Sequence, residues 1–209
     1  MTVLSHRGYW LTPAEKNTAT AFRRSFDLGF GTETDVRDRL GELVISHDPP
    51  RGGEMLLSEF LDLLAGQDLP LALNVKADGL AEGIRDALNR RGLTKWFVFD
   101  MSVPDTLRQL AVGNPVFVRA SEYERAPVLL DRAAGVWLDG FTGEWWDAEL
   151  REWADRTRPV CLVSPELHGR DPAVAWNHLA TVRASGVEGL MLCTDRPEQA
   201  GRFFAGGGA

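Results

Sequence analysis

Short β-rich runs alternate with amphipathic helical stretches along this chain, and this alternation limits the possible folds more than any other feature. The runs occupy residues 3–6, 32–36, 71–75, 97–100, 116–119, 136–139, 160–163 and 190–193. Helical patterns lie between most of them, at residues 18–28, 80–90, 104–110, 148–155, 172–184 and 197–204. Strands that alternate with helices predict βαβ units and a parallel sheet.

The number of β-rich runs favours a barrel. Eight parallel strands close a (β/α)₈, or TIM, barrel, so we predict an α/β fold of this class. Apolar runs such as Leu-Ala-Leu-Asn-Val at residues 71–75 are typical of strands covered on both faces. A further run at residues 43–47 follows a turn at residues 38–41 and predicts a hairpin at the barrel rim. The alternative is an open doubly wound sheet, but the first strand lacks the Gly-rich phosphate loop of that fold.

Length and charge narrow the class of protein. The 209 residues contain no linker of low complexity, so we expect one barrel domain over residues 1–209. A formal net charge of −7 argues against a nucleic-acid partner, and no apolar stretch reaches the ~18 residues of a membrane span. The two cysteines lie in apolar β-rich runs and are expected to be buried reduced thiols. With no secretory leader visible, the expected location is the cytoplasm.

Polar and ionisable side chains gather where the predicted strands end. In barrels of this class, the catalytic groups come from the carboxyl ends of the strands and the loops that follow them. The group includes His6, Arg7, Glu33, Asp35, His47, Asn74, Lys76, Asp100, Asp139, Glu166, His168, Arg170 and Asp195. So many polar residues at one predicted face indicate an enzyme.

Glu33 and Asp35 are two residues apart on a predicted strand, so their side chains point to the same face. If that face is the barrel interior, two carboxylates meet at close range. Such a pair is unfavourable unless a cation bridges the acids or one of them takes up a proton. Hard oxygen ligands of this kind suit Mg²⁺ or Ca²⁺. The alternative is a pair that faces solvent on an edge strand.

Two histidines and two cations occur at the same predicted rim. His6 and His47 both close β-rich runs, and imidazole is the side chain best suited to proton transfer near neutral pH. Arg7 and Lys76 lie at neighbouring strand ends, where they could hold a phosphate. The alternatives are structural histidines and a lysine that is solvated at the rim.

Three ionisable side chains follow the seventh predicted strand. Glu166, His168 and Arg170 lie within five consecutive positions of the segment Ser-Pro-Glu-Leu-His-Gly-Arg. Loops at the carboxyl ends of barrel strands carry substrate contacts, so we predict that these residues touch the substrate. A surface loop with ordinary charges is the alternative.

At these positions the sequence resembles the glycerophosphodiester phosphodiesterase family of PLC-like phosphodiesterase barrels. That family opens with His-Arg-Gly, matched at residues 6–8, and continues to Glu-Asn-Thr, matched with one interposed residue at 15–18. Its Glu-x-Asp-Val motif is matched at residues 33–36, and its His-Asp motif at residues 47–48. Its third-strand Glu-x-Lys motif corresponds to Asn-Val-Lys at residues 74–76, and its closing strand to Thr-Asp-Arg-Pro at 194–197.

The resemblance implies a metal-dependent hydrolase of a small-molecule phosphodiester, such as a glycerophosphodiester. The residues it implies are Glu33, Asp35 and Asn74 for one divalent cation, Mg²⁺ or Ca²⁺, His6 and His47 for general acid–base catalysis, and Arg7 and Lys76 for the phosphate. It leaves open which histidine is the acid, and it leaves the oligomeric state undecided.

Two departures from the family pattern bear on the function. Asn74 stands where the family has a glutamate, so the cation site loses one formal negative charge, although an amide oxygen can still coordinate a hard cation. Residues 48–70 are too few for the large insert that the family often carries there, which predicts a compact barrel with a more open site. The alternatives are a non-catalytic phosphodiester-binding barrel with a degraded metal site and a lyase-like release of a cyclic phosphate.

Overall fold

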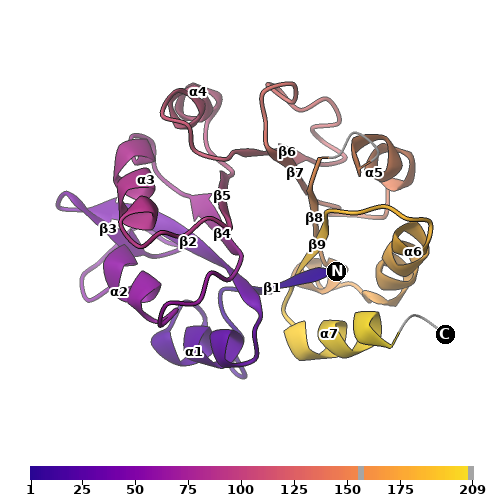
Figure 1. The fold of residues 1–209 in the computed structure, drawn as a ribbon, viewed down its shortest axis with the longest axis horizontal. Helices are drawn as coiled ribbons and strands as arrows, with labels where there is room; N and C mark the ends of the chain where they lie inside the picture. Colours follow the sequence, from indigo (N-terminus) through magenta and orange to yellow (C-terminus); the bar gives the residue numbers. More distant parts are fainter. Residues whose placement is uncertain (155–157, 207–209) are drawn as a thin grey trace. The chain divides into compact units, whose positions relative to one another are not determined.

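Strands and helices alternate through residues 1–154 and 158–206, which are the residues that the computed structural model describes (Figure 1). The chain divides into two compact units. Unit 1 contains Met1–Leu4 and Phe117–Ala209, and unit 2 contains Ser5–Val116. The first strand, β1 (Thr2–His6), spans the boundary between them.

Unit 2 is built on parallel strands with one antiparallel addition. The strands β2 (Gly31–Arg39), β4 (Leu71–Val75) and β5 (Trp96–Phe99) pair in the order β5-β4-β2. The strand β3 (Glu42–Ile45) turns back on β2 and pairs with it antiparallel. The hairpin predicted at this point is therefore confirmed.

The helices of unit 2 bury their apolar faces beside these strands. Thr18 caps the first of them by accepting a hydrogen bond from Ala21 N, and Ser102 caps the last. Phe22 and Phe60, from two different helices, meet edge to face with ring centroids 4.6 Å apart. The helices are α1 (Ala19–Asp27), α2 (Leu57–Asp62), α3 (Ala81–Asn89) and α4 (Val103–Ala111).

Unit 1 repeats the parallel pattern. Its strands pair in the order β9-β8-β7-β6. They are β6 (Phe117–Ala120), β7 (Gly135–Leu138), β8 (Val160–Val163) and β9 (Leu190–Thr194). The helical elements are α5 (Asp147–Ala154), the 3₁₀ turn η2 (Pro165–His168), α6 (Ala173–Ala184) and α7 (Pro197–Ala205).

All eight predicted β-rich runs are strands, and the six predicted helices are present with ends shifted by at most one residue. Asp155, the last residue of one predicted helix, lies outside the described residues. The helix α2 was not predicted, because it is only six residues long and the residue that precedes it, Leu56, has an apolar side chain that cannot cap it. Residues 121–134, between β6 and β7, form turns and no helix. No helix of the described part of the chain is long and apolar enough to cross a membrane.

The register of unit 2 fixes which side chains share a face. Asp35 on β2 pairs with Asn74 on β4, and Glu33 lies two residues before Asp35 on the same strand. Side chains of paired residues point to the same side of a sheet, as do alternate residues of one strand. The side chains of these three residues therefore lie on one face of unit 2. Every residue of β4 is buried, as predicted for a strand covered on both faces.

Candidate active site

The acid pair of β2 is buried in unit 2. Glu33 is 2% exposed and Asp35 is fully buried, so neither belongs to a solvent-facing edge. Asp35 is surrounded by positively charged and donor groups. Arg7 Nε lies 3.1 Å from its Oδ2, and Lys76 Nζ lies 3.4 Å from its Oδ1. Asn17 donates a hydrogen bond from Nδ2 to Asp35 Oδ2 at 2.9 Å.

Glu33 lies in a less favourable setting than Asp35. Burial raises the pKa of Glu33 well above its ordinary value, and the negative charge of Asp35 raises it further. Arg7 and Lys76 offset only part of this shift. The Arg7 backbone N–H donates to Glu33 Oε2 at 3.3 Å, and His6 Nε2 lies 3.9 Å from the same oxygen. Burial beside Asp35 therefore shifts the pKa of Glu33 in the direction of proton uptake, which is one of the two resolutions expected for such a pair.

The turn after β1 brings His6 and Arg7 to the acids. Arg7 adopts a left-handed backbone with φ of 57°, and Gly8 follows with φ of 82°. A Cβ at Gly8 would lie 2.8 Å from the Cβ of Ala21, so only glycine allows α1 to pack this closely. Left-handed non-glycine residues are uncommon and collect at functional sites. The tight turn at Arg7 and Gly8 therefore places His6 beside the acid pair, and it requires glycine at position 8.

In the side-chain amide of Asn74, the nitrogen forms a hydrogen bond and the oxygen forms none among the described residues. Its Nδ2 donates to Asp100 Oδ2 at 3.2 Å. Its Oδ1 is buried and has no hydrogen-bond partner among the described residues. The side chain is only 7% exposed, so bulk water cannot easily supply the missing donor. Such an acceptor is the kind of atom that a cation would satisfy.

The donor set of this face fits a hard divalent cation. The two carboxylates of β2 and the amide oxygen of Asn74 are all oxygen ligands, which Mg²⁺ and Ca²⁺ prefer. Within the described residues, no group of three or more His, Cys, Asp or Glu side chains is arranged to hold a metal ion. A cation site here therefore depends on the amide oxygen of Asn74, which is not one of those residue types.

His47 lies on the loop after β3 and is 46% exposed at its side chain. Its Nδ1 lies 2.9 Å from Asp48 Oδ1. The hydrogen bond with His47, and then the charges of His47, Arg51 and Arg7, lower the pKa of Asp48. The charge of Arg7 therefore reaches this pair, although no hydrogen bond or ion pair joins His47 to Glu33 or Asp35 in the described part of the chain.

Glu166, from η2 in unit 1, is fully engaged with protein groups. Its carboxylate accepts hydrogen bonds from the hydroxyls of Ser164 and Thr194. A third hydrogen bond comes from the backbone N–H of Asp195, at 3.2 Å. Glu166 thus ties the end of β8 to the end of β9.

The other two predicted substrate-contacting residues also lie in unit 1 and have protein partners. His168 Nε2 lies 2.7 Å from Asp139 Oδ1. Arg170 Nη1 lies 2.7 Å from Glu144 Oε1, and its Nη2 donates to the Gly140 carbonyl. These two side-chain pairs lie at the ends of β7 and β8.

Sequence reasoning assigned no role to two residues of unit 2 that contact the candidate site. Asn17 bridges the strand by donating to Asp35 and accepting from Thr34 Oγ1 at 2.9 Å, and Asp100 accepts from Asn74. Both have left-handed backbones, with φ of 58° at Asn17 and 67° at Asp100. The signals were present, since Asn17 lies in the Glu-Lys-Asn-Thr stretch and Asp100 ends a predicted strand.

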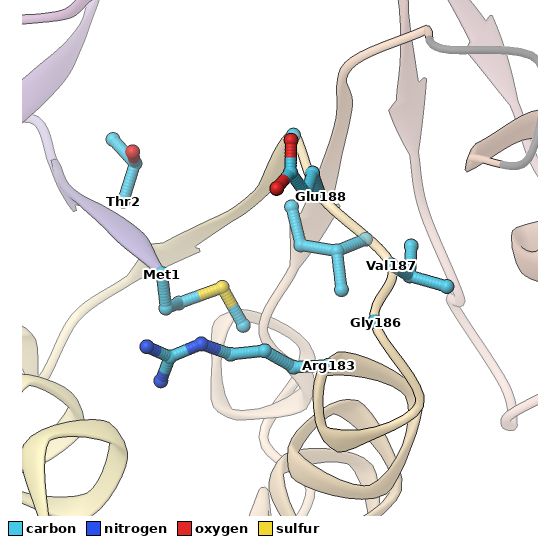
Figure 2. Close-up of a pocket in the computed structure, with 8 residues that line it drawn as sticks. Met1, Thr2, Arg183, Gly186, Val187 and Glu188 are labelled. Carbon is cyan, nitrogen blue, oxygen red and sulfur yellow. The ribbon is translucent and has the colours of Figure 1, made fainter.

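A pocket of unit 1 contains none of the predicted site residues (Figure 2). It has a volume of about 370 Å³ and lies at the amino ends of β1 and β9. Its lining comes from Met1, Thr2, Arg183, Leu190 and residues 186–189. Active sites of (β/α)₈ barrels lie at the opposite, carboxyl ends of the strands, so this hollow is not the candidate active site.

The solved structures similar to this chain include several phosphodiesterases, and at lower TM-scores of 0.54 two dihydropteroate synthases. A glycerophosphodiester phosphodiesterase from Parabacteroides distasonis is 18% identical with a TM-score of 0.69, and the match covers 98% of this chain and 97% of that one. A glycerophosphodiester phosphodiesterase from Agrobacterium tumefaciens is 17% identical with a TM-score of 0.70, covering 99% of both chains. A phosphodiesterase from Oleispira antarctica, in complex with the product sn-glycerol-3-phosphate, is 14% identical with a TM-score of 0.67, covering 97% and 96%.

No protein-family model and no curated protein sequence matches this chain. The structural matches define its class as the α/β barrels of (β/α)₈ type, so the predicted fold class is confirmed. More narrowly, the fold is that of the glycerophosphodiester phosphodiesterases over nearly the full chain. The resemblance predicted from the motifs is thus confirmed at the level of the fold.

Proposed function

We propose that the protein is a metal-dependent phosphodiesterase that cleaves a glycerophosphodiester or a related, including sugar-linked, phosphodiester. The surroundings of the acid pair carry this proposal. Two buried carboxylates, an unsatisfied amide oxygen, two cations and a histidine gather on one face of unit 2. A merely structural acid pair does not need a proton-transfer group beside it.

In this proposal Glu33, Asp35 and Asn74 hold one divalent cation, Mg²⁺ or Ca²⁺. When bound, the cation supplies positive charge for the phosphate oxygens as negative charge builds there. Glu33 would be ionised beside a bound cation, because the positive charge would offset the repulsion between the two acids. Asn17 keeps the Asp35 carboxylate oriented through the hydrogen bond at 2.9 Å.

Arg7 and Lys76 bind the non-bridging oxygens of the phosphodiester. Both already lie within 3.4 Å of Asp35, so they bring positive charge to the same face as the acids. His6 and His47 are the general acid–base pair. One removes a proton from the attacking water, and the other donates a proton to the leaving alkoxide.

The solved neighbours support glycerophosphodiesters as the first substrates to test. The phosphodiesterase from Oleispira antarctica is described with sn-glycerol-3-phosphate as its product. We extend that product class to this chain as part of the proposal. Contact of Glu166, His168 and Arg170 with the substrate stays a prediction; in the structure each of these side chains has a protein partner.

The proposal also covers the domain organisation and the cellular location of the protein. We infer one domain over residues 1–209, since the strands and helices of both units are needed to complete a barrel of this class. The cytoplasm stays the predicted location. Cys161 and Cys193 are both buried and neither forms a disulfide, which is in keeping with a reducing compartment.

The test is turnover of bis(p-nitrophenyl) phosphate and of glycerophosphodiesters, with Mg²⁺, with Ca²⁺ and with EDTA. We expect hydrolysis that requires a divalent cation and that is lost in His6→Ala and Glu33→Ala variants. Phosphorus NMR of the products identifies a monoester for the hydrolase and a cyclic phosphate for a lyase. Binding of phosphodiesters without cation-dependent turnover of any of them would identify a binding protein and overturn the proposal.

A further inference from the structure

Asp100 fixes the orientation of the Asn74 amide. A carboxylate accepts hydrogen bonds and cannot donate them, so Asp100 Oδ2 must receive the NH₂ end of the amide, at 3.2 Å. The amide oxygen is therefore turned away from Asp100. This contact settles a choice that the similar shapes of the two amide ends would otherwise leave open.

The amide oxygen that results is buried and unsatisfied. Asn74 Oδ1 has no hydrogen-bond partner among the described residues, and the side chain is 93% buried, being 7% exposed. Asn74 is paired with Asp35 across β2 and β4, so it shares the face that carries the two acids. A buried acceptor without a donor is costly, and a cation on that face would satisfy it.

We propose that Asp100 is a positioning residue of the cation site, which holds the Asn74 oxygen toward the acids and returns the negative charge that an amide at position 74 lacks. This inference rests on the proposed function, because it assumes that Glu33, Asp35 and Asn74 bind a divalent cation. Partners of metal ligands commonly orient the ligand and raise its basicity in this way. Asp100 acts through Asn74 and need not touch the cation itself.

The backbone conformation of Asp100 favours Asp or Asn at this position. Its φ of 67° is left-handed, a conformation that Asp and Asn adopt more readily than other non-glycine residues. The side chain leaves the end of β5, which pairs with β4 beside Asn74. Replacement by asparagine therefore keeps the backbone, the side-chain shape and an acceptor oxygen, and removes only the charge.

The experiment measures binding of Ca²⁺ and of Mg²⁺ by isothermal titration calorimetry in the full chain. We expect Asp100→Asn to weaken the dissociation constant by about 10- to 100-fold, the usual effect of losing a partner of a metal ligand. The matched control is Asp86→Asn, which removes the same charge from a 52% exposed side chain on α3. The control is expected to bind both cations as the wild type does.

A second variant moves the charge instead of removing it. In Asn74→Asp with Asp100→Asn, the carboxylate moves to position 74 and the amide moves to position 100. Because the two changes compensate each other, we expect affinity within about threefold of wild type. Thermal unfolding in EDTA completes the test. A positioning role leaves the unfolding midpoint of Asp100→Asn at or above that of the wild type, because a charge has left an acidic face.

The outcomes separate this inference from the proposed function. If the wild type binds a divalent cation and Asp100→Asn binds it equally well, Asp100 has only a structural role and the inference is overturned alone. A lower unfolding midpoint in EDTA with unchanged affinity overturns it in the same way. If the wild type binds neither cation, the metal-dependent function falls and the inference falls with it.

Discussion

Glu33 in unit 2 and Glu166 in unit 1 are both partly or fully withdrawn from solvent near strand ends, yet their surroundings differ. Glu166 accepts hydrogen bonds from two hydroxyls and a backbone N–H. Glu33 is buried beside a second carboxylate, and its pKa is raised well above the ordinary value. A carboxylate whose oxygens accept hydrogen bonds from protein groups stabilises the fold. One that is buried beside a like charge is stable only with a proton or with a ligand.

The largest effect is expected at the histidine beside Glu33. His6→Ala should lower turnover of a phosphodiester by about 10²- to 10⁴-fold, because a positioned proton-transfer group contributes that much. The measurement is steady-state kinetics with saturating Mg²⁺ or Ca²⁺. His178→Ala is the control, since His178 is paired with Asp147 on the surface of unit 1 and is expected to change turnover little.

Glu33→Gln separates a ligand role from a structural role. The amide is neutral and nearly the same shape, so we expect cation affinity to fall by at least about 10-fold, because a charged ligand has become a neutral one. Stability in EDTA should hold or rise, because the amide is neutral beside Asp35 at every pH and does not need to take up a proton. Calorimetric titration and thermal unfolding of the same sample measure the two effects. A large loss of stability with unchanged cation affinity would show that Glu33 stabilises the fold, as Glu166 does, and is not a cation ligand.

Glu166→Gln should show the opposite pattern. Gln cannot accept all three of the hydrogen bonds in the present arrangement, so we expect the free energy of unfolding to fall by about 1–3 kcal/mol. Chemical denaturation of the wild type and the variant measures this change. A raised KM without a loss of stability would instead support the predicted contact of Glu166 with the substrate.

The smallest effect is the pH dependence of the cation-free protein. The folded pKa of Glu33 is raised above 4.5, so the folded state holds this proton more tightly than the unfolded chain does. The stabilisation is fully present below the unfolded pKa and is lost as pH rises through the folded pKa. In EDTA, the unfolding midpoint should therefore decline with rising pH above about 4.5 more steeply in the wild type than in Glu33→Gln. Parallel curves for the two proteins would contradict the raised pKa.

Much of this comparison could be predicted from sequence, because it depends on local spacing. Glu33 and Asp35 are two residues apart on a strand, so a shared face follows from the period of a β-strand. The alternation of apolar runs and helical patterns likewise predicts the (β/α)₈ order of elements. The short helix α2 was not predicted because six residues preceded by an apolar residue carry little helical signal.

The remaining features depend on contacts that no local pattern encodes. Asn17 contacts Asp35, 18 residues away in sequence, and Asp100 contacts Asn74, 26 residues away. Asn17 and Asp100 both have left-handed backbones. A glutamate at a strand end can have its oxygens hydrogen-bonded by protein groups, as Glu166 does, or lie beside a second carboxylate with a raised pKa, as Glu33 does. Which of the two occurs depends on the donors and charges that the fold brings to the carboxylate. Sequence located both glutamates but could not tell the two conditions apart.

The most direct test of the central claim is a crystal structure of the protein soaked with Mn²⁺, using its anomalous signal to locate the ion. Mn²⁺ prefers the same oxygen ligands as Mg²⁺. We predict one strong anomalous peak, bound by Glu33, Asp35 and the side-chain oxygen of Asn74. A protein that crystallises with Mn²⁺ present but has no peak on this face of β2 and β4 would contradict the account.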